Sequence, residues 1–101
     1  MKTIDMGINT EPPDEARTAD AIERWSEIGN VNAVETIRDV HKLAVSLKKQ
    51  IEDAVESDGV AALDWRCVGA VKFHANASCW AAAFPQYRFE IQRFKCIVYK
   101  E

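Results

Sequence analysis

The chain has no long apolar run, and nowhere does it approach the roughly 20 consecutive apolar residues that span a bilayer. Its first eight residues contain no apolar stretch of the kind that a signal peptide needs, so we expect no secretory signal. It also lacks an excess of positive charge, since 13 basic and 16 acidic residues give a formal net charge of −3. Binding nucleic acid without sequence preference requires a basic face. The composition therefore predicts a protein with neither a membrane nor a nucleic-acid partner.

Cysteine is scarce, and the three thiols lack the spacing of a metal site. Cys67, Cys79 and Cys96 include no Cys-x-x-Cys pair. Together with His74 they fall on different expected strands, so we expect no metal and no cofactor. Without a secretory signal, three cysteines are typical of reduced intracellular thiols. We favour the interpretation that they act as small hydrophobic residues.

A second candidate for chemistry is the segment Ala77–Ala81, which reads Ala-Ser-Cys-Trp-Ala and resembles the nucleophile segment of papain-like cysteine proteases. Those enzymes need a base histidine and an orienting asparagine far downstream. The short stretch after Cys79 contains no histidine, and a thiol without a base is a weak catalyst. The sequence also has no glycine-rich phosphate loop and no convergent pair of carboxylates. We therefore disfavour a cysteine hydrolase and expect a protein that is not an enzyme.

The length of 101 residues predicts a single domain. Residues 1–13 contain Pro12 and Pro13 and show little periodicity, so they are interpreted as a flexible or loosely docked arm ahead of a domain over residues 14–101. The alternation of Ile4, Met6 and Ile8 leaves a short edge strand in this arm as an alternative.

Two helices are expected next. The first begins near Asp14, carries apolar residues at helical spacing and ends at Gly29. The second begins at Asn32, where Glu35 stands at the capping-box spacing, and ends at Ser57–Gly59. An apolar stripe at steps of three and four predicts its buried face. The stripe consists of Val34, Ile37, Val40, Ala44, Leu47, Ile51 and Ala54. This helix is longer than a small sheet needs, so a break near Arg38–His41 is expected.

The rest of the chain has the pattern of strands with one buried face. Asp64–Phe73 is interpreted as a strand that places its aromatic and sulfur-containing residues on one face. In Tyr87–Ile91 apolar and charged residues alternate strictly, and Phe94–Lys100 is rich in β-branched and aromatic residues. The predicted fold class is α+β, with two N-terminal helices followed by an antiparallel β-sheet.

Several of these segments resemble the eight-kilodalton dynein light chains. Leu43–Val55 is similar to the second helix of that family, including its paired lysines. Trp65–Gly69 matches the Trp-x-Cys opening of the family's first long strand, and Phe73 follows at the family's phenylalanine spacing. Tyr87–Ile91 and Phe94–Lys100 resemble its closing hairpin. The resemblance covers residues 36–100 and departs from the family pattern where His74 replaces a glycine.

The resemblance implies a non-catalytic, dimeric light chain of a dynein motor complex. In that family two protomers exchange a strand, and segments of the dynein intermediate chain or other extended peptides add as strands to exposed edges. The implied location is the cytoplasm or cytoskeleton, including the axoneme of a cilium or flagellum. A t-complex-type dynein light chain, another small peptide-binding adaptor, and a heterodimer with another light chain remain alternatives.

The implied sites fall in the C-terminal half. The expected partner-binding residues are Phe73, His74, Ala75, Asn76, Ala77, Ser78, Tyr87 and Phe89. The expected dimer interface consists of Trp65, Cys67, Phe73 and Trp80. Short side chains at residues 75–77 would let another backbone approach closely. The alternative is that these small residues pack beneath the second helix.

Overall fold

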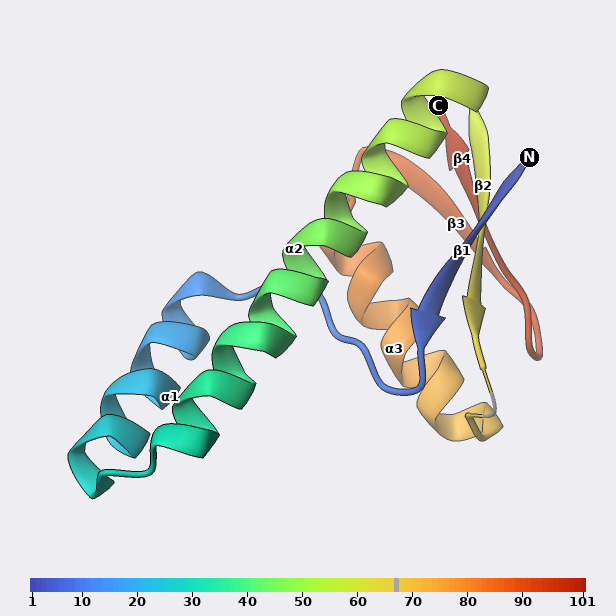
Figure 1. Cartoon of the computed structure of the whole chain (residues 1–101). Helices are drawn as coiled ribbons and strands as arrows, with labels where there is room; N and C mark the ends of the chain where they lie inside the picture. The colour runs from blue at the N-terminus through green and yellow to red at the C-terminus, as the bar shows by residue number, and fades with distance from the viewer. Residues whose placement is uncertain (67) are drawn as a thin grey trace.

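The computed structural model describes residues 1–66 and 68–101, which fold into a four-stranded sheet with helices on one face (Figure 1). The order of the strands in the sheet is β1-β2-β4-β3. Two helices, α2 and α3, lie on the same side of this sheet (Figure 1). The predicted α+β class is confirmed, but the sheet is mixed rather than antiparallel and the described residues form one helix more than predicted.

The N-terminal segment is part of the sheet. β1 (Lys2–Gly7) pairs in parallel with β2 (Val60–Trp65). A parallel pair needs a long crossover connection, which the first two helices supply. Ile4 and Met6 are buried in the core, whereas Ile8 is exposed. The prediction of a flexible arm is therefore wrong for Lys2–Gly7, and the alternative of an edge strand holds.

Helix α1 (Glu15–Ile28) has the bounds expected from the sequence. Asp14 is the N-cap, and its Oδ1 accepts a hydrogen bond of 3.0 Å from the Arg17 N–H. Gly29 ends the helix with φ of 82°, a left-handed conformation that glycine adopts at little cost. The short link to the next helix folds α1 back against α2, and the two form a hairpin (Figure 1).

Helix α2 (Val31–Asp58) is longer than predicted and unbroken. Its N-cap is Asn30 rather than Asn32, because the Asn30 Oδ1 accepts from the Ala33 N–H at 3.0 Å. Its 28 residues span about 42 Å, whereas six-residue strands span about 20 Å. The expected break near Arg38–His41 is absent because the N-terminal half of α2 pairs with α1 beyond the sheet.

Helix α3 (Ala70–Ala83) replaces the strand that was predicted around Phe73. Its buried residues recur at helical steps, and its many alanines favour a helix over a strand. The buried residues are Phe73, Asn76, Ala77 and Trp80. The alternation read across Asp64–Phe73 spans two elements, since β2 ends at Trp65. Period two and period 3.6 cannot be separated over so few residues.

The two C-terminal strands confirm the sequence prediction. β3 (Tyr87–Ile91) and β4 (Cys96–Lys100) form an antiparallel hairpin, and β4 also pairs with β2. β4 therefore lies inside the sheet, and the two edges belong to β1 and β3.

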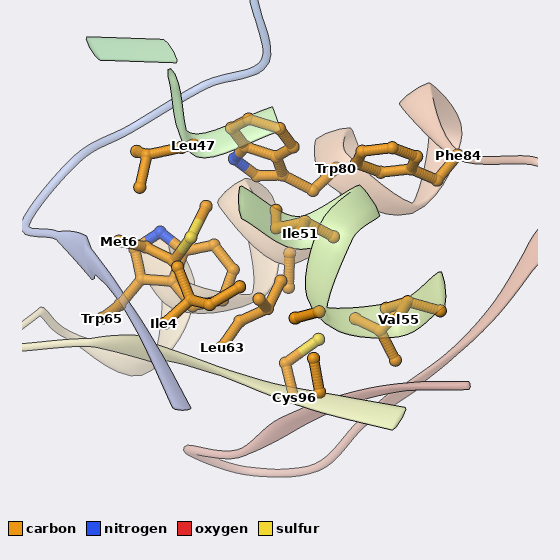
Figure 2. Packing of buried hydrophobic residues seen from close by; sticks show 14 of the residues in the cluster. Ile4, Met6, Leu47, Ile51, Val55, Leu63, Trp65, Trp80, Phe84 and Cys96 are labelled. Atoms are coloured by element: carbon orange, nitrogen blue, oxygen red, sulfur yellow. The ribbon is translucent and has the colours of Figure 1, made fainter. Parts of the chain in front are cut away.

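The core lies between the inner face of the sheet and helices α2 and α3 (Figure 2). Most of the predicted α2 stripe is buried, including Leu47 and Ile51. Val40, however, is 60% exposed. It lies in the half of α2 that projects past the sheet, so its position in the stripe alone does not bury it.

Candidate functional site

The edge of β3 is the candidate site, because its backbone polar groups face away from the sheet. The Gln92 N–H donates to the Lys95 carbonyl at 2.8 Å, which fixes the hairpin register. Residues alternate in direction along an antiparallel strand, so Arg88 and Glu90 bond to β4. The N–H and C=O groups of Phe89 and Ile91 then point outward. No strand in the part of the chain that the structure describes pairs with this edge.

Aromatic side chains line the inner side of this edge. Tyr87, Phe89 and Ile91 are half-buried and pack against the core. The Phe84 ring stacks on Tyr87 with a centroid distance of 5.5 Å and on Phe89 with one of 6.2 Å. If a partner strand were added beside β3, its inward-facing side chains could pack against the partly exposed apolar surface of Tyr87, Phe89 and Ile91.

The charged residues of β3 are held over the outer face of the sheet. The Tyr99 hydroxyl donates to Glu90 Oε2 at 3.1 Å, and the Arg88 guanidinium lies 4.2 Å from the centre of the Tyr99 ring. Desolvation and the bond to Glu90 raise the pKa of Tyr99. Both charged side chains of β3 are thus engaged with Tyr99, and the half-exposed Arg88 also lies 3.7 Å from Glu101.

The start of β3 is fixed to the end of α2. The Tyr87 hydroxyl donates to Glu56 Oε1 at 2.7 Å, and Lys100 Nζ lies 2.7 Å from Glu56 Oε2. Desolvation, and to a smaller extent the hydrogen bond to Glu56, raises the pKa of Tyr87 to about 12. The bonds from Lys100 and Tyr87 lower the pKa of Glu56. The edge is therefore carried by a strand whose position is already set before any partner binds.

The opposite edge is less accessible to a partner. The parallel register with β2 turns the backbone groups of Thr3 and Asp5 outward. Asp5 also accepts from the Gly7 N–H at 2.9 Å and lies 3.2 Å from the Arg66 guanidinium. Charged side chains and a bulge at the end of β1 are features that protect sheet edges.

The predicted groove strand does not exist, because the whole of Phe73–Ser78 belongs to α3. Phe73, Asn76 and Ala77 are buried, and Ala77 packs in the core together with residues of α2. The alternative that the small residues are buried within the chain holds for Asn76 and Ala77 but not for Ala75, which is exposed. His74, Ala75 and Ser78 lie on the exposed side of the helix. Of the eight expected partner-binding residues, only Tyr87 and Phe89 lie on a sheet edge.

The residues predicted for a dimer interface are not at the surface of the chain where the structure describes them. Trp65, Phe73 and Trp80 are buried within the single chain. Trp65 and Phe73 pack edge to face, with ring centroids 5.5 Å apart. Cys67 lies outside the described residues. These aromatic rings fill the core of the single chain because α3, a helix that was not predicted, covers the sheet.

A hydrogen-bonded chain that the sequence did not indicate joins α1 to α2. His41 Nδ1 lies 3.2 Å from the Thr18 hydroxyl, and His41 Nε2 lies 3.1 Å from Glu15 Oε1. A carboxylate only accepts, so the tautomer that satisfies both contacts carries its proton on Nε2 and accepts the Thr18 hydroxyl proton at Nδ1. The order hydroxyl, imidazole, carboxylate can activate a nucleophile. Here it links two exposed helices, and the Glu15 carboxylate is largely in solvent.

The described residues form neither a metal site nor a membrane-spanning helix. Within residues 1–66 and 68–101, no three His, Cys, Asp or Glu side chains are grouped closely enough to hold a metal ion. In the same described ranges, no helix has both the length and the apolar character needed to cross a membrane.

Comparison of the chain with protein-family models, curated proteins and solved structures found no match. The site is therefore assigned from its own geometry.

The two described cysteines should differ sharply in reactivity. Burial raises the pKa of the Cys96 thiol to about 12, whereas Cys79 is exposed on α3. The thiolate is the reactive form. In a Cys67→Ser variant at neutral pH, iodoacetamide is expected to modify Cys79 in the folded protein and Cys96 only after unfolding. Peptide mass spectrometry checks the order, and modification of Cys96 as fast as Cys79 would show that the core opens readily.

Proposed function

We propose that this chain is a non-catalytic adaptor that binds an extended segment of a partner protein as a further strand along β3. The observation that carries this proposal is the outward direction of the backbone groups of Phe89 and Ile91 at an edge that no described strand covers. Recognition by strand addition uses such an edge for backbone hydrogen bonds and neighbouring pockets for side chains.

The energetics of this edge predict modest affinity. Each backbone hydrogen bond contributes about 1 kcal/mol net, so four outward groups supply roughly 4 kcal/mol before the peptide is ordered. Side-chain contacts beside Tyr87, Phe89 and Ile91 must supply the remainder. If two copies of the chain act together on two copies of a partner, avidity adds a factor of about 10²–10⁴.

The resemblance to the eight-kilodalton dynein light chains supplies the candidate partner. It rests on Leu43–Val55 and on the closing hairpin, and β3 belongs to that hairpin. We propose that the bound segment comes from a dynein intermediate chain and that the chain serves as a light chain of that motor complex. Because α3 occupies the place of the family's peptide-binding strand, β3 takes that role in the proposal.

The test combines amide exchange with one variant. Adding peptides from dynein intermediate chains should slow exchange of the outward amides of Phe89 and Ile91. The amides of Arg88 and Glu90, already bonded to β4, should change little. Ile91→Pro removes one outward donor without touching the ladder to β4, so affinity measured by calorimetry should fall at least about tenfold. The matched control is Thr3→Pro, which removes an outward N–H from the other edge and should leave binding unchanged.

The outcomes separate the two parts of the proposal. If the peptides bind but Phe89 and Ile91 gain no protection, strand addition at β3 is wrong. If no intermediate-chain peptide binds at millimolar concentration, the dynein assignment is wrong. The same exchange measurement on an unrelated library of extended peptides then tests the edge itself.

A further inference from the structure

We propose that the hairpin of α1 and α2 is an interface for a second copy of this chain, so that two hairpins pair face to face as a four-helix bundle. This inference rests on surfaces remote in sequence from β3 and does not depend on the proposed function. The hairpin takes the place of the aromatic residues that were predicted for a dimer interface and are buried within the chain.

The hairpin projects from the sheet and leaves apolar surface uncovered (Figure 1). No residue of α1 is buried, although its apolar residues follow a helical period. A 14-residue helix is marginal on its own in water, so its stability depends on packing. Six of the large apolar residues exposed in the chain lie on these two helices. They are Trp25, Ile28, Val31, Val40, Leu43 and Val45.

One face of the hairpin gathers much of this surface. A groove of ≈ 380 Å³ lies between the two helices and the segment that leads into α1, and its lining includes Ala21, Thr36 and Val40. Ile28 lies two turns after Ala21, and Leu43 lies two turns after Thr36, so each continues the same side of its helix. Ile28 is 71% exposed and Leu43 is 52% exposed. These five residues define the hairpin face.

Two arginines border the hairpin face on α1 and an aspartate borders it on α2, while Glu11 and Asp14 line the groove at the start of α1. Arg17 lines the groove on the α1 side, and Arg24 follows two turns later on the same side. Asp39 lies three residues after Thr36 and four before Leu43, so it borders the face on the α2 side. Arg17 and Arg24 make only exposed contacts, at 3.6 Å to Glu11 and 3.8 Å to Asp20.

This arrangement is complementary to itself about a two-fold axis. The Thr18–His41 contact places residue 18 level with residue 41 along the antiparallel pair, so Asp39 is level with Asp20. If α1 of one copy lies against α2 of the other, the partner's Asp39 comes between Arg17 and Arg24. A partner with a uniformly acidic or uniformly basic face would match only one helix. A second copy matches both at once, as an isologous interface requires.

The expected affinity is moderate because the face is short. Helix α1 is about 21 Å long, which places the interface at the small end of stable complexes. We expect a dimer of about twice 11.4 kDa with a dissociation constant in the micromolar range. Sedimentation equilibrium between about 1 and 200 μM full-length protein measures it.

The decisive variants keep the fold, since they change only exposed side chains. Val40→Glu places a charge in the hairpin face and should raise the dissociation constant at least tenfold. Val45→Glu is the matched control, because Val45 is 44% exposed on the same helix but about 140° around it. It should leave dimerisation unchanged, and circular dichroism should show the same helix content in both variants.

A charge exchange tests the pairing itself. Arg24→Glu and Asp39→Arg should each weaken the dimer, and the double variant should recover most of the loss. A chain that is monomeric at 200 μM overturns the proposal. So does a dimer that Val40→Glu leaves intact, or one that Ile91→Pro disrupts while Val40→Glu does not, since that dimer would form through the β3 edge.

Discussion

Replacing Trp80 with alanine is expected to lower the free energy of unfolding by about 3–5 kcal/mol. The Trp80 side chain is fully buried and stacks on Phe84 with a centroid distance of 6.2 Å (Figure 2). Its indole N–H also donates to the Thr10 carbonyl at 2.8 Å, which ties the segment after β1 to α3. The substitution removes ring volume and leaves that carbonyl without its donor. Urea denaturation followed by circular dichroism at fixed protein concentration measures the loss.

Two further variants separate the contributions to this loss. Trp80→Phe keeps much of the packing but removes the indole donor, so it should cost less than the alanine variant and is the usable form if Trp80→Ala does not fold. Trp25→Ala is the control for loss of a tryptophan, because Trp25 is 40% exposed on the hairpin. A denaturation midpoint for Trp80→Ala no lower than that of Trp25→Ala would mean that α3 is not packed as described.

Replacing Ile51 with alanine is expected to cost about 2–5 kcal/mol. Ile51 is fully buried at the centre of the α2 face, where its neighbours in the core include Leu63, Cys96 and Trp80 (Figure 2). The loss combines removal of apolar surface from the core with the cavity that the rigid sheet cannot close. The same measurement applied to Leu47→Ala should give a loss in this range, since Leu47 lies one turn earlier on the buried face.

Val45→Ala serves as the control on the same helix. Val45 is exposed, so its truncation should change the unfolding free energy by no more than about 0.5 kcal/mol. The difference in unfolding free energy between Ile51→Ala and Val45→Ala shows which side of α2 faces the sheet, because both residues lie on the same helix. Equal midpoints for the two variants would show that α2 is rotated relative to the sheet.

The first two helices and the C-terminal hairpin were predictable because their signals are local. Asp14 caps α1, Gly29 ends it in a left-handed conformation, and the stripe through Leu47 and Ile51 marks the buried face of α2. The alternation of Tyr87–Ile91 likewise fixes which face of β3 turns to the core. Each of these features depends on residues within a few positions of one another, so the sequence alone determines them.

The predictions that failed depend on contacts between distant parts of the chain. Phe73 and Trp80 suit either a strand or a helix over a short window, and α3 forms because its apolar side fits between the sheet and α2. Lys2–Gly7 becomes a strand only because β2, more than fifty residues later, offers a partner. The alternation of Ile4 and Met6 left a strand open as an alternative, but nothing in so short a stretch identifies the strand it pairs with.

For the candidate site too, the sequence determined some features and the tertiary structure decided the others. The sequence placed Tyr87 and Phe89 on the apolar face of a strand and, by resemblance, among the partner-binding residues. The strand order β1-β2-β4-β3 decided that their strand lies at an edge of the sheet. The sequence also placed Val40 in the stripe of α2, whereas the length of the strands decided that this residue lies beyond the sheet. Local patterns fix which side of an element is apolar. Only the tertiary structure decides which apolar sides and strand edges are covered, because that depends on where each element ends in space.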